Sequence, residues 1–217
     1  MGHESQGSLF DALRPAISDA RLSTYLRAAG FDEARALDLY LWNVRLGEAF
    51  HLSIQAVEVA LRNRVSEVLV QEFGSEWWLS ERLLAILDDE RRQDLALVLT
   101  RIRNRKLAQD HGQVVAGLSF GFWVALLHKK YNPTIWSRRL RAGFPDLPAD
   151  RSRKSLEMAS RRVAQLRNRI WHHEPIIKLD MSAEYGNLMT LLAWISQPKA
   201  DWIRHNSRVP TLLRQKP

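Results

Sequence analysis

The chain has 217 residues, of which 46% are hydrophobic and 26% are charged, and this balance fits one folded domain and excludes a disordered chain. It contains no cysteine, which excludes disulfides, thiolate metal sites and cysteine nucleophiles and favours a reducing, cytoplasmic compartment. The formal net charge is +8, and almost all of this excess lies between Arg138 and Arg169, where ten basic residues face three acidic ones.

The first third of the chain predicts a flexible start and one long helix. We expect residues 1–17 to be a flexible N-terminus. Ser18 then has the character of an N-cap for a short helix over residues 21–29 that Gly30 closes. Apolar residues at three- and four-residue steps predict a helical segment over residues 32–73, which Gly47 either divides or bends: Leu37, Leu41, Val44, Phe50, Ile54, Val57, Leu61, Val65 and Leu69.

The middle of the chain predicts three further helices, over residues 80–87, 89–107 and 113–131. The last of these contains the longest apolar run, Val114–Leu127, with a turn at residues 110–112 before it. A run of about 14 residues is shorter than the roughly 20 that span a bilayer, so we interpret it as a buried core helix. The N-terminal residues also lack a signal pattern, so we expect neither a membrane nor export.

The last third predicts a short helix over residues 134–141, a loop over 144–150 and a helix from about 150 to 173. Two more helices follow, over residues 182–195 and 198–205. No long stretch alternates with period two, so the fold class is all-α. We expect one helical domain over residues 18–207 and a C-terminal tail over 208–217.

The segment Arg161–Pro175 combines arginines, an asparagine and two adjacent histidines in one helical run that proline must end. A local cationic field favours a polyanion such as nucleic acid, although a solvated helix face gives the same pattern. Histidine is the side chain best suited to move protons near neutral pH, and arginine binds phosphate as a fork. Together they suit cleavage of RNA without a metal, in which arginine stabilises charge on the transition state.

The alternative for the histidine pair is an ordinary capped helix end. A metal site is not expected, because adjacent histidines diverge by about 100° on a helix and no known metal-ligand spacing occurs. We therefore expect no metal ligands and no cofactor.

The run Arg167-Asn-Arg-Ile-Trp-His172 matches the R-N-x-x-x-H form of the R-x(4–6)-H motif of the HEPN superfamily. The surrounding chain resembles the Abi-like (abortive infection) branch of that superfamily. The similarity extends from about residue 20 to the C-terminus over blocks in the same order: Ala36–Asn43, Glu58–Asn63, Phe73–Trp77, Leu118–Trp123, Trp194–Ser196 and a helix around Trp202.

This resemblance implies a HEPN-like helical bundle with flanking helices and a metal-independent endoribonuclease that acts as a homodimer. It assigns Arg167 and His172 as the catalytic pair and Asn168 as an orienting residue. His173 also satisfies the looser spacing and remains a supporting or substitute base.

The remaining expectations concern RNA, partners and one neighbouring ion pair. Arg161, Arg162 and Arg169 are candidate RNA contacts. The resemblance also implies a growth-arresting toxin or antiphage effector, with an antitoxin or regulatory protein as a further partner. A non-catalytic helical module that binds RNA or protein is the alternative. Glu58 and Arg62 lie four residues apart and are interpreted as an intrahelical ion pair.

Overall fold

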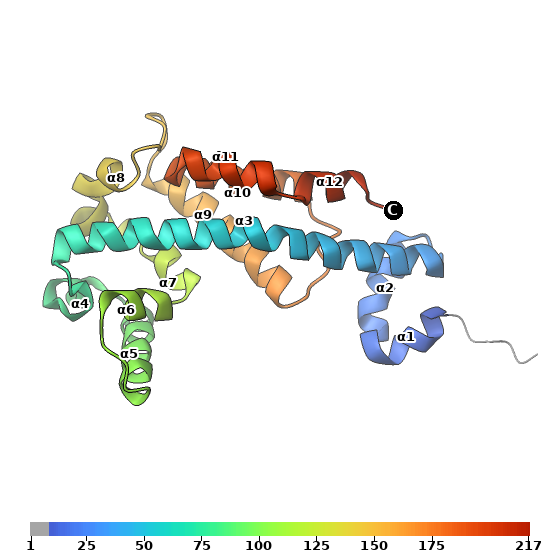
Figure 1. Cartoon of the computed structure of the whole chain (residues 1–217), viewed down its shortest axis with the longest axis horizontal. Coiled ribbons are helices and arrows are strands. Elements are labelled where there is room, and N and C mark those ends of the chain that lie inside the picture. The colour runs from blue at the N-terminus through green and yellow to red at the C-terminus, as the bar shows by residue number, and fades with distance from the viewer. Residues whose placement is uncertain (1–8) are drawn as a thin grey trace, which may run out of the picture.

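The computed structural model describes residues 9–217, and these residues form an all-α fold organised along one helix of 41 residues, α3. Helices α1 and α2 lie near its start, α4 to α6 lie near its end, and α10 to α12 run along one side (Figure 1). The helices are α1 (Leu9–Ile17), α2 (Asp19–Ala28), α3 (Glu33–Phe73), α4 (Glu81–Ile86), α5 (Asp89–Asn104), α6 (His111–Gly117), α7 (Phe120–Ala125), α8 (Ser137–Gly143), α9 (Arg153–Trp171), α10 (Met181–Ile195), α11 (Gln197–Asn206) and α12 (Val209–Arg214), with short turns η1 (Trp77–Leu79), η2 (Lys129–Tyr131) and η3 (Asn132–Trp136). The predicted all-α class is confirmed.

Helix α3 is continuous, so the alternative in which Gly47 divides it is wrong. Asp32 caps its start by accepting a hydrogen bond from the Arg35 N–H at 2.9 Å. Gly74 ends it with a positive φ of 94°, which glycine adopts without the strain a side chain would cause. Gly47 lies under Ile170 of α9, whose Cγ2 would be 3.6 Å from an added Cβ atom, so this is where α9 crosses α3.

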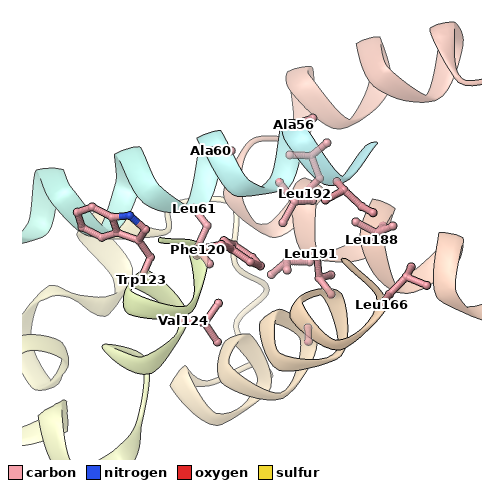
Figure 2. Packing of buried hydrophobic residues seen from close by; sticks show 14 of the residues in the cluster. Ala56, Ala60, Leu61, Phe120, Trp123, Val124, Leu166, Leu188, Leu191 and Leu192 are labelled. Atoms are coloured by element: carbon pink, nitrogen blue, oxygen red, sulfur yellow. The ribbon is translucent and has the colours of Figure 1, made fainter. Parts of the chain in front are cut away.

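The core forms where α3 meets α7, α9 and α10. Figure 2 shows its side chains converging from these four helices: Ala56, Ala60 and Leu61 of α3, Phe120, Trp123 and Val124 of α7, Leu166 of α9, and Leu188, Leu191 and Leu192 of α10. The two alanines leave room for the leucines of α10 against the backbone of α3. Dense apolar packing of this kind supplies most of the stability of a helical domain.

Both predicted flexible ends are in part helical. Residues 1–8 lie outside the described part of the chain, but α1 follows them and buries Phe10 against the core. The expected tail contains α12, which buries Val209 and Leu212. The indole N–H of Trp42 donates to the Leu212 carbonyl at 2.7 Å and ties this helix to α3. The tail prediction is therefore wrong for residues 209–214, and the flexible start is wrong for 9–17.

The apolar helix expected over residues 113–131 is also wrong, because it is divided between α6 and α7. The Ser119 hydroxyl accepts a hydrogen bond from the Phe122 N–H at 3.2 Å and so starts a new helix. The predicted turn at residues 110–112 instead begins α6, where Asp110 accepts from the Gln113 N–H at 2.9 Å. No helix in residues 9–217 is long and apolar enough to span a membrane.

Helix α9 starts at Arg153, about three residues after the predicted start near residue 150, because Arg141 organises the loop before it. The guanidinium of Arg141 donates to carbonyl oxygens of Leu147, Pro148, Ala149 and Arg151 at 2.8 to 3.0 Å. These bonds hold residues 147–151 outside a helix. Arg141 therefore stabilises the fold, although it is one of the ten basic residues of the cationic segment between Arg138 and Arg169.

Candidate functional site

The last turn of α9 ends in a left-handed cap that presents two histidines to solvent. His172 is the C-cap residue, and His173 takes a positive φ of 55°. The His173 N–H then donates to the Ile170 carbonyl at 3.0 Å, and the Glu174 N–H donates to the Arg169 carbonyl at 2.9 Å. This pair of bonds satisfies helix-end carbonyls, as in the Schellman motif. Both histidine side chains are exposed.

Arg167 lies within the last turns of α9 and is held from three sides. Its Nε donates to Oε1 of Glu58 on α3 at 3.0 Å, and its Nη1 donates to Oδ1 of Asn168 at 3.2 Å. Its Cζ lies 4.9 Å from the centre of the Trp171 ring, within cation–π range. Neither hydrogen bond uses Nη2, and the side chain is 32% exposed. Arg167 is thus an oriented cation with one edge available to a ligand.

Glu58 pairs with Arg167 across the helix crossing rather than with Arg62 along α3. In residues 9–217, no ion pair joins Glu58 to Arg62, and the Nε of Arg62 is buried without a hydrogen-bond partner. Arg62 lies close to Lys199, where burial and the positive charge of Arg62 lower the pKa of the lysine. The interpretation as an intrahelical ion pair is therefore wrong, because the crossing of α3 and α9 brings a stronger partner to Glu58.

The three arginines predicted to contact RNA all lie on the exposed surface of α9 beside carboxylates. Arg161 Nε is 3.1 Å from Glu157, Arg162 Nε is 3.0 Å from Glu184, and Arg169 Nε is 3.9 Å from Glu174. The hydrogen bond to Glu184 raises the pKa of Arg162. The three guanidinium groups are about half exposed, although Glu157 and Glu184 are largely buried, so a phosphate can reach these cations from solvent.

Two hollows lie beside the end of α9. The larger, about 790 Å³, lies between α2, α3 and the end of α9, and His173 and Trp171 line it. The smaller, about 460 Å³, is lined by Asn168 and Arg161, together with Lys130 from η2. Among the predicted site residues, His173 lines the larger hollow and Asn168 and Arg161 line the smaller one. The predicted catalytic pair, Arg167 and His172, lines neither of the two.

The two histidines are not bonded to the predicted catalytic arginine. Within the described residues, no hydrogen bond joins Arg167 to His172 or to His173. The side chains share one helix end, but the structure brings only Arg167 and Asn168 into direct contact.

His51 is a site residue that the sequence did not single out. Its ring stacks on the indole of Trp171, with centroids 5.0 Å apart and an angle of 23° between the planes. Both rings line the larger cleft. Nothing in the sequence marks His51, because its partner lies on a different helix far along the chain.

No three His, Asp or Glu side chains in residues 9–217 converge as a metal-binding group. Comparison with known proteins returns no match to a family model, to a curated protein or to a solved structure. The chemistry of the site is therefore argued from its own side chains and from the sequence motif.

Proposed function

We propose that the protein is a metal-independent endoribonuclease of the HEPN type, resembling Abi-like proteins, whose reaction centre is the end of α9. The observation that carries the proposal is the state of Arg167. This arginine is oriented by Glu58 and Asn168, keeps Nη2 clear of both bonds and is partly exposed. It precedes two exposed histidines on a cap that ends the same helix.

In the proposed reaction, His172 removes the proton of a ribose 2′-hydroxyl and the oxygen attacks the adjacent phosphorus. The bond from phosphorus to the 5′-oxygen breaks, and that oxygen takes a proton from a protonated histidine or water. The products are a 2′,3′-cyclic phosphate and a 5′-hydroxyl. Arg167 donates to a non-bridging oxygen and stabilises the extra negative charge of the transition state. Asn168 fixes the guanidinium, and His173 is the supporting or substitute base.

The proposal includes a homodimer in which two motifs act together. Leu41, Val44 and Leu52 support it, because these apolar side chains are exposed along α3, the helix that carries Glu58. Exposed apolar surface of this kind favours association with a partner. The resemblance extends the proposal to a growth-arresting antiphage effector that an antitoxin or regulatory protein controls.

The test is cleavage of a labelled single-stranded RNA in the presence of a metal chelator. We expect Arg167→Ala and His172→Ala each to slow cleavage by roughly 100-fold or more, because each removes a group that acts in the transition state. His205→Ala, which removes an exposed histidine on α11, is the matched control and should cleave at the parent rate. The cleavage rate of His173→Ala shows its role: a smaller loss than in His172→Ala means that His173 supports the reaction, and an equal or larger loss means that it is the main base.

A double variant, Arg167→Ala with His172→Ala, that cleaves as fast as the parent contradicts the proposal. If the parent binds RNA without forming product, the protein is the non-catalytic module instead. The exposed Arg161, Arg162 and Arg169 favour that second candidate, because about half of each side chain faces solvent, where it can contact phosphates. Its binding would then weaken steeply as salt rises.

A further inference from the structure

The cleft beside the end of α9 has the chemistry of a nucleobase site. Its walls include Trp171, Tyr40, Tyr25, Ile170 and Ile176, so they are mainly aromatic and aliphatic. Its volume of about 790 Å³ falls in the range of sites for small organic ligands, about 300–1,000 Å³. The indole of Trp171 is 39% exposed, although large aromatic side chains usually pack inside. A flat, partly apolar ligand would fit these walls.

The aromatic groups of the cleft lead directly to Arg167. His51 stacks on Trp171 at 5.0 Å, and the guanidinium of Arg167 lies 4.9 Å from the same indole ring. Trp171 therefore contacts both His51 and Arg167, and a base that stacks on this aromatic pair would lie on the same row of groups as the guanidinium. His51, Trp171 and Arg167 form one connected row.

The polar groups of the cleft suit the edge of a base better than a phosphate. Glu48 and Glu174 line it with a single fixed cation, Arg21, so the charged groups are acidic on balance. The Asn43 side chain accepts a hydrogen bond from the Ile176 N–H at 2.8 Å through Oδ1. Its NH₂ group is therefore the part that remains to donate to a base carbonyl. The carboxylates can accept from exocyclic amino groups, which guanine, adenine and cytosine carry and uracil lacks.

We infer that this cleft binds one nucleobase of the RNA, stacked on the His51–Trp171 pair, and that Glu48 selects a base with an exocyclic amino group. The inference rests on the proposal that RNA is the ligand. It gives the protein a base preference next to the phosphate that Arg167 contacts. Stacking supplies affinity for every base, and the carboxylate supplies the difference between bases.

The test uses heptanucleotides of uracil with 2′-O-methyl riboses, which cannot be cleaved through the 2′-oxygen, and with guanine, adenine or cytosine at the central position. Binding is measured by fluorescence anisotropy at 50 and 200 mM salt. We expect the parent to bind the amino-bearing oligonucleotides at least about 5-fold more tightly than the uracil one, since one such hydrogen bond commonly gives that discrimination. Trp171→Ala should weaken binding of all four by roughly 10- to 100-fold, and His51→Ala should weaken it less.

Two controls separate stacking from general effects on the fold and on charge. Trp202→Ala removes an indole that is 63% exposed on α11, and it should bind like the parent. Glu48→Ala, which removes the accepting oxygens, should keep the affinity for the uracil oligonucleotide and lose the preference between bases. The ratio of the affinity of Trp171→Ala to that of the parent should be the same at 50 and 200 mM salt, because stacking releases no counterions. Circular dichroism and thermal melting check that each variant is folded.

The outcomes also separate this inference from the nuclease proposal. If unmodified RNA is cleaved but the parent shows no base preference, or Trp171→Ala and His51→Ala bind within twofold of the parent, the cleft does not hold a base and the nuclease stands. If the preference is present without any cleavage, the cleft stands and the nuclease does not. Failure to bind any of the oligonucleotides overturns the inference.

Discussion

Both halves of α9 carry arginines, but they use them differently. In the first half, Arg153 and Glu157 are only 12% and 13% exposed and form an ion pair at 2.7 Å, which Arg161 joins from the surface. In the last turns, Arg167 is more exposed and precedes two exposed histidines. A charge count treats both halves as one cationic segment. Burial and pairing show that the Arg153–Glu157 pair serves the fold, whereas Arg161 and the last turns of α9 present polar groups to solvent.

Two arginines before α9 also form contacts within the fold, as Arg153 does. Arg139 pairs with Glu72 at 3.3 Å, and Arg141 binds four loop carbonyl oxygens. Both residues belong to the segment that carries the net charge of the chain, yet both hold the fold together. An RNA-binding surface predicted from that segment is therefore smaller than the sequence suggests.

The largest effect on stability should come from Arg153→Ala, which tests the structural half of α9. The change leaves the largely buried carboxylate of Glu157 with only the surface residue Arg161 as a partner, and it removes the hydrogen bond that Arg153 Nη1 donates to the Leu127 carbonyl. We expect a loss of about 3 kcal/mol in the free energy of unfolding, measured by urea denaturation. Lys154→Ala, at the exposed neighbouring position, should change it by less than about 0.5 kcal/mol. Equal losses in the two variants would remove the distinction between the halves.

Glu157→Gln should have a smaller effect that depends on pH. Burial acts to raise the pKa of Glu157, but the hydrogen bond from Arg153 and the charges of Arg153, Arg161 and His128 outweigh it and lower the pKa below its ordinary 4.5. The native ion pair therefore stabilises the fold above pH 4.5, and this contribution is lost as the pH falls through the lower, native pKa. At pH 7 we expect the variant to be less stable by about 2 kcal/mol. Urea titrations at pH 7 and pH 3 should show this difference shrinking, and a constant difference would contradict it.

The sequence predicted most helices because their signals are local. Asp32 and Gly74 bound α3, and Ser80 caps α4 by accepting from the Leu83 N–H, as expected from their side chains. Helices α1 and α12 were missed because each is short and depends on burying a few residues against distant parts of α3. The break at Ser119 was missed because an apolar run of this length hides a single capping hydroxyl.

The candidate site was predictable only as far as it lies along one helix. Pro175 and the motif indicated a helix end carrying Arg167, Asn168 and two histidines, and the structure places them there. The contacts of Arg167 with Glu58 and of Trp171 with His51 join α9 to α3. Such contacts depend on how two helices cross, which no spacing within either helix encodes. The cleft that Tyr40 and Asn43 of α3 line could not be predicted from the sequence for the same reason.

The smallest effect on stability should come from Glu58→Gln, which tests whether the second half of α9 is held for a ligand rather than for the fold. The amide keeps an oxygen that can accept from Arg167 Nε but removes the charge that competes with a phosphate. We expect the free energy of unfolding to change by less than about 1 kcal/mol, because the pair is partly exposed. Affinity for single-stranded RNA should rise severalfold. The slope of log affinity against log salt concentration should become steeper by about 0.7, the value for one added phosphate contact.

The matched control for that change is Glu67→Gln, which removes a more exposed carboxylate on the same helix, one that pairs with Arg64 at 3.0 Å. Both variants raise the net charge by one, so a general electrostatic attraction would strengthen RNA binding equally in the two. A gain confined to Glu58→Gln means that Arg167 itself contacts the phosphate. A gain of the same size in both variants means that the ion pair across the helix crossing is structural, and the two halves of α9 then differ only in exposure.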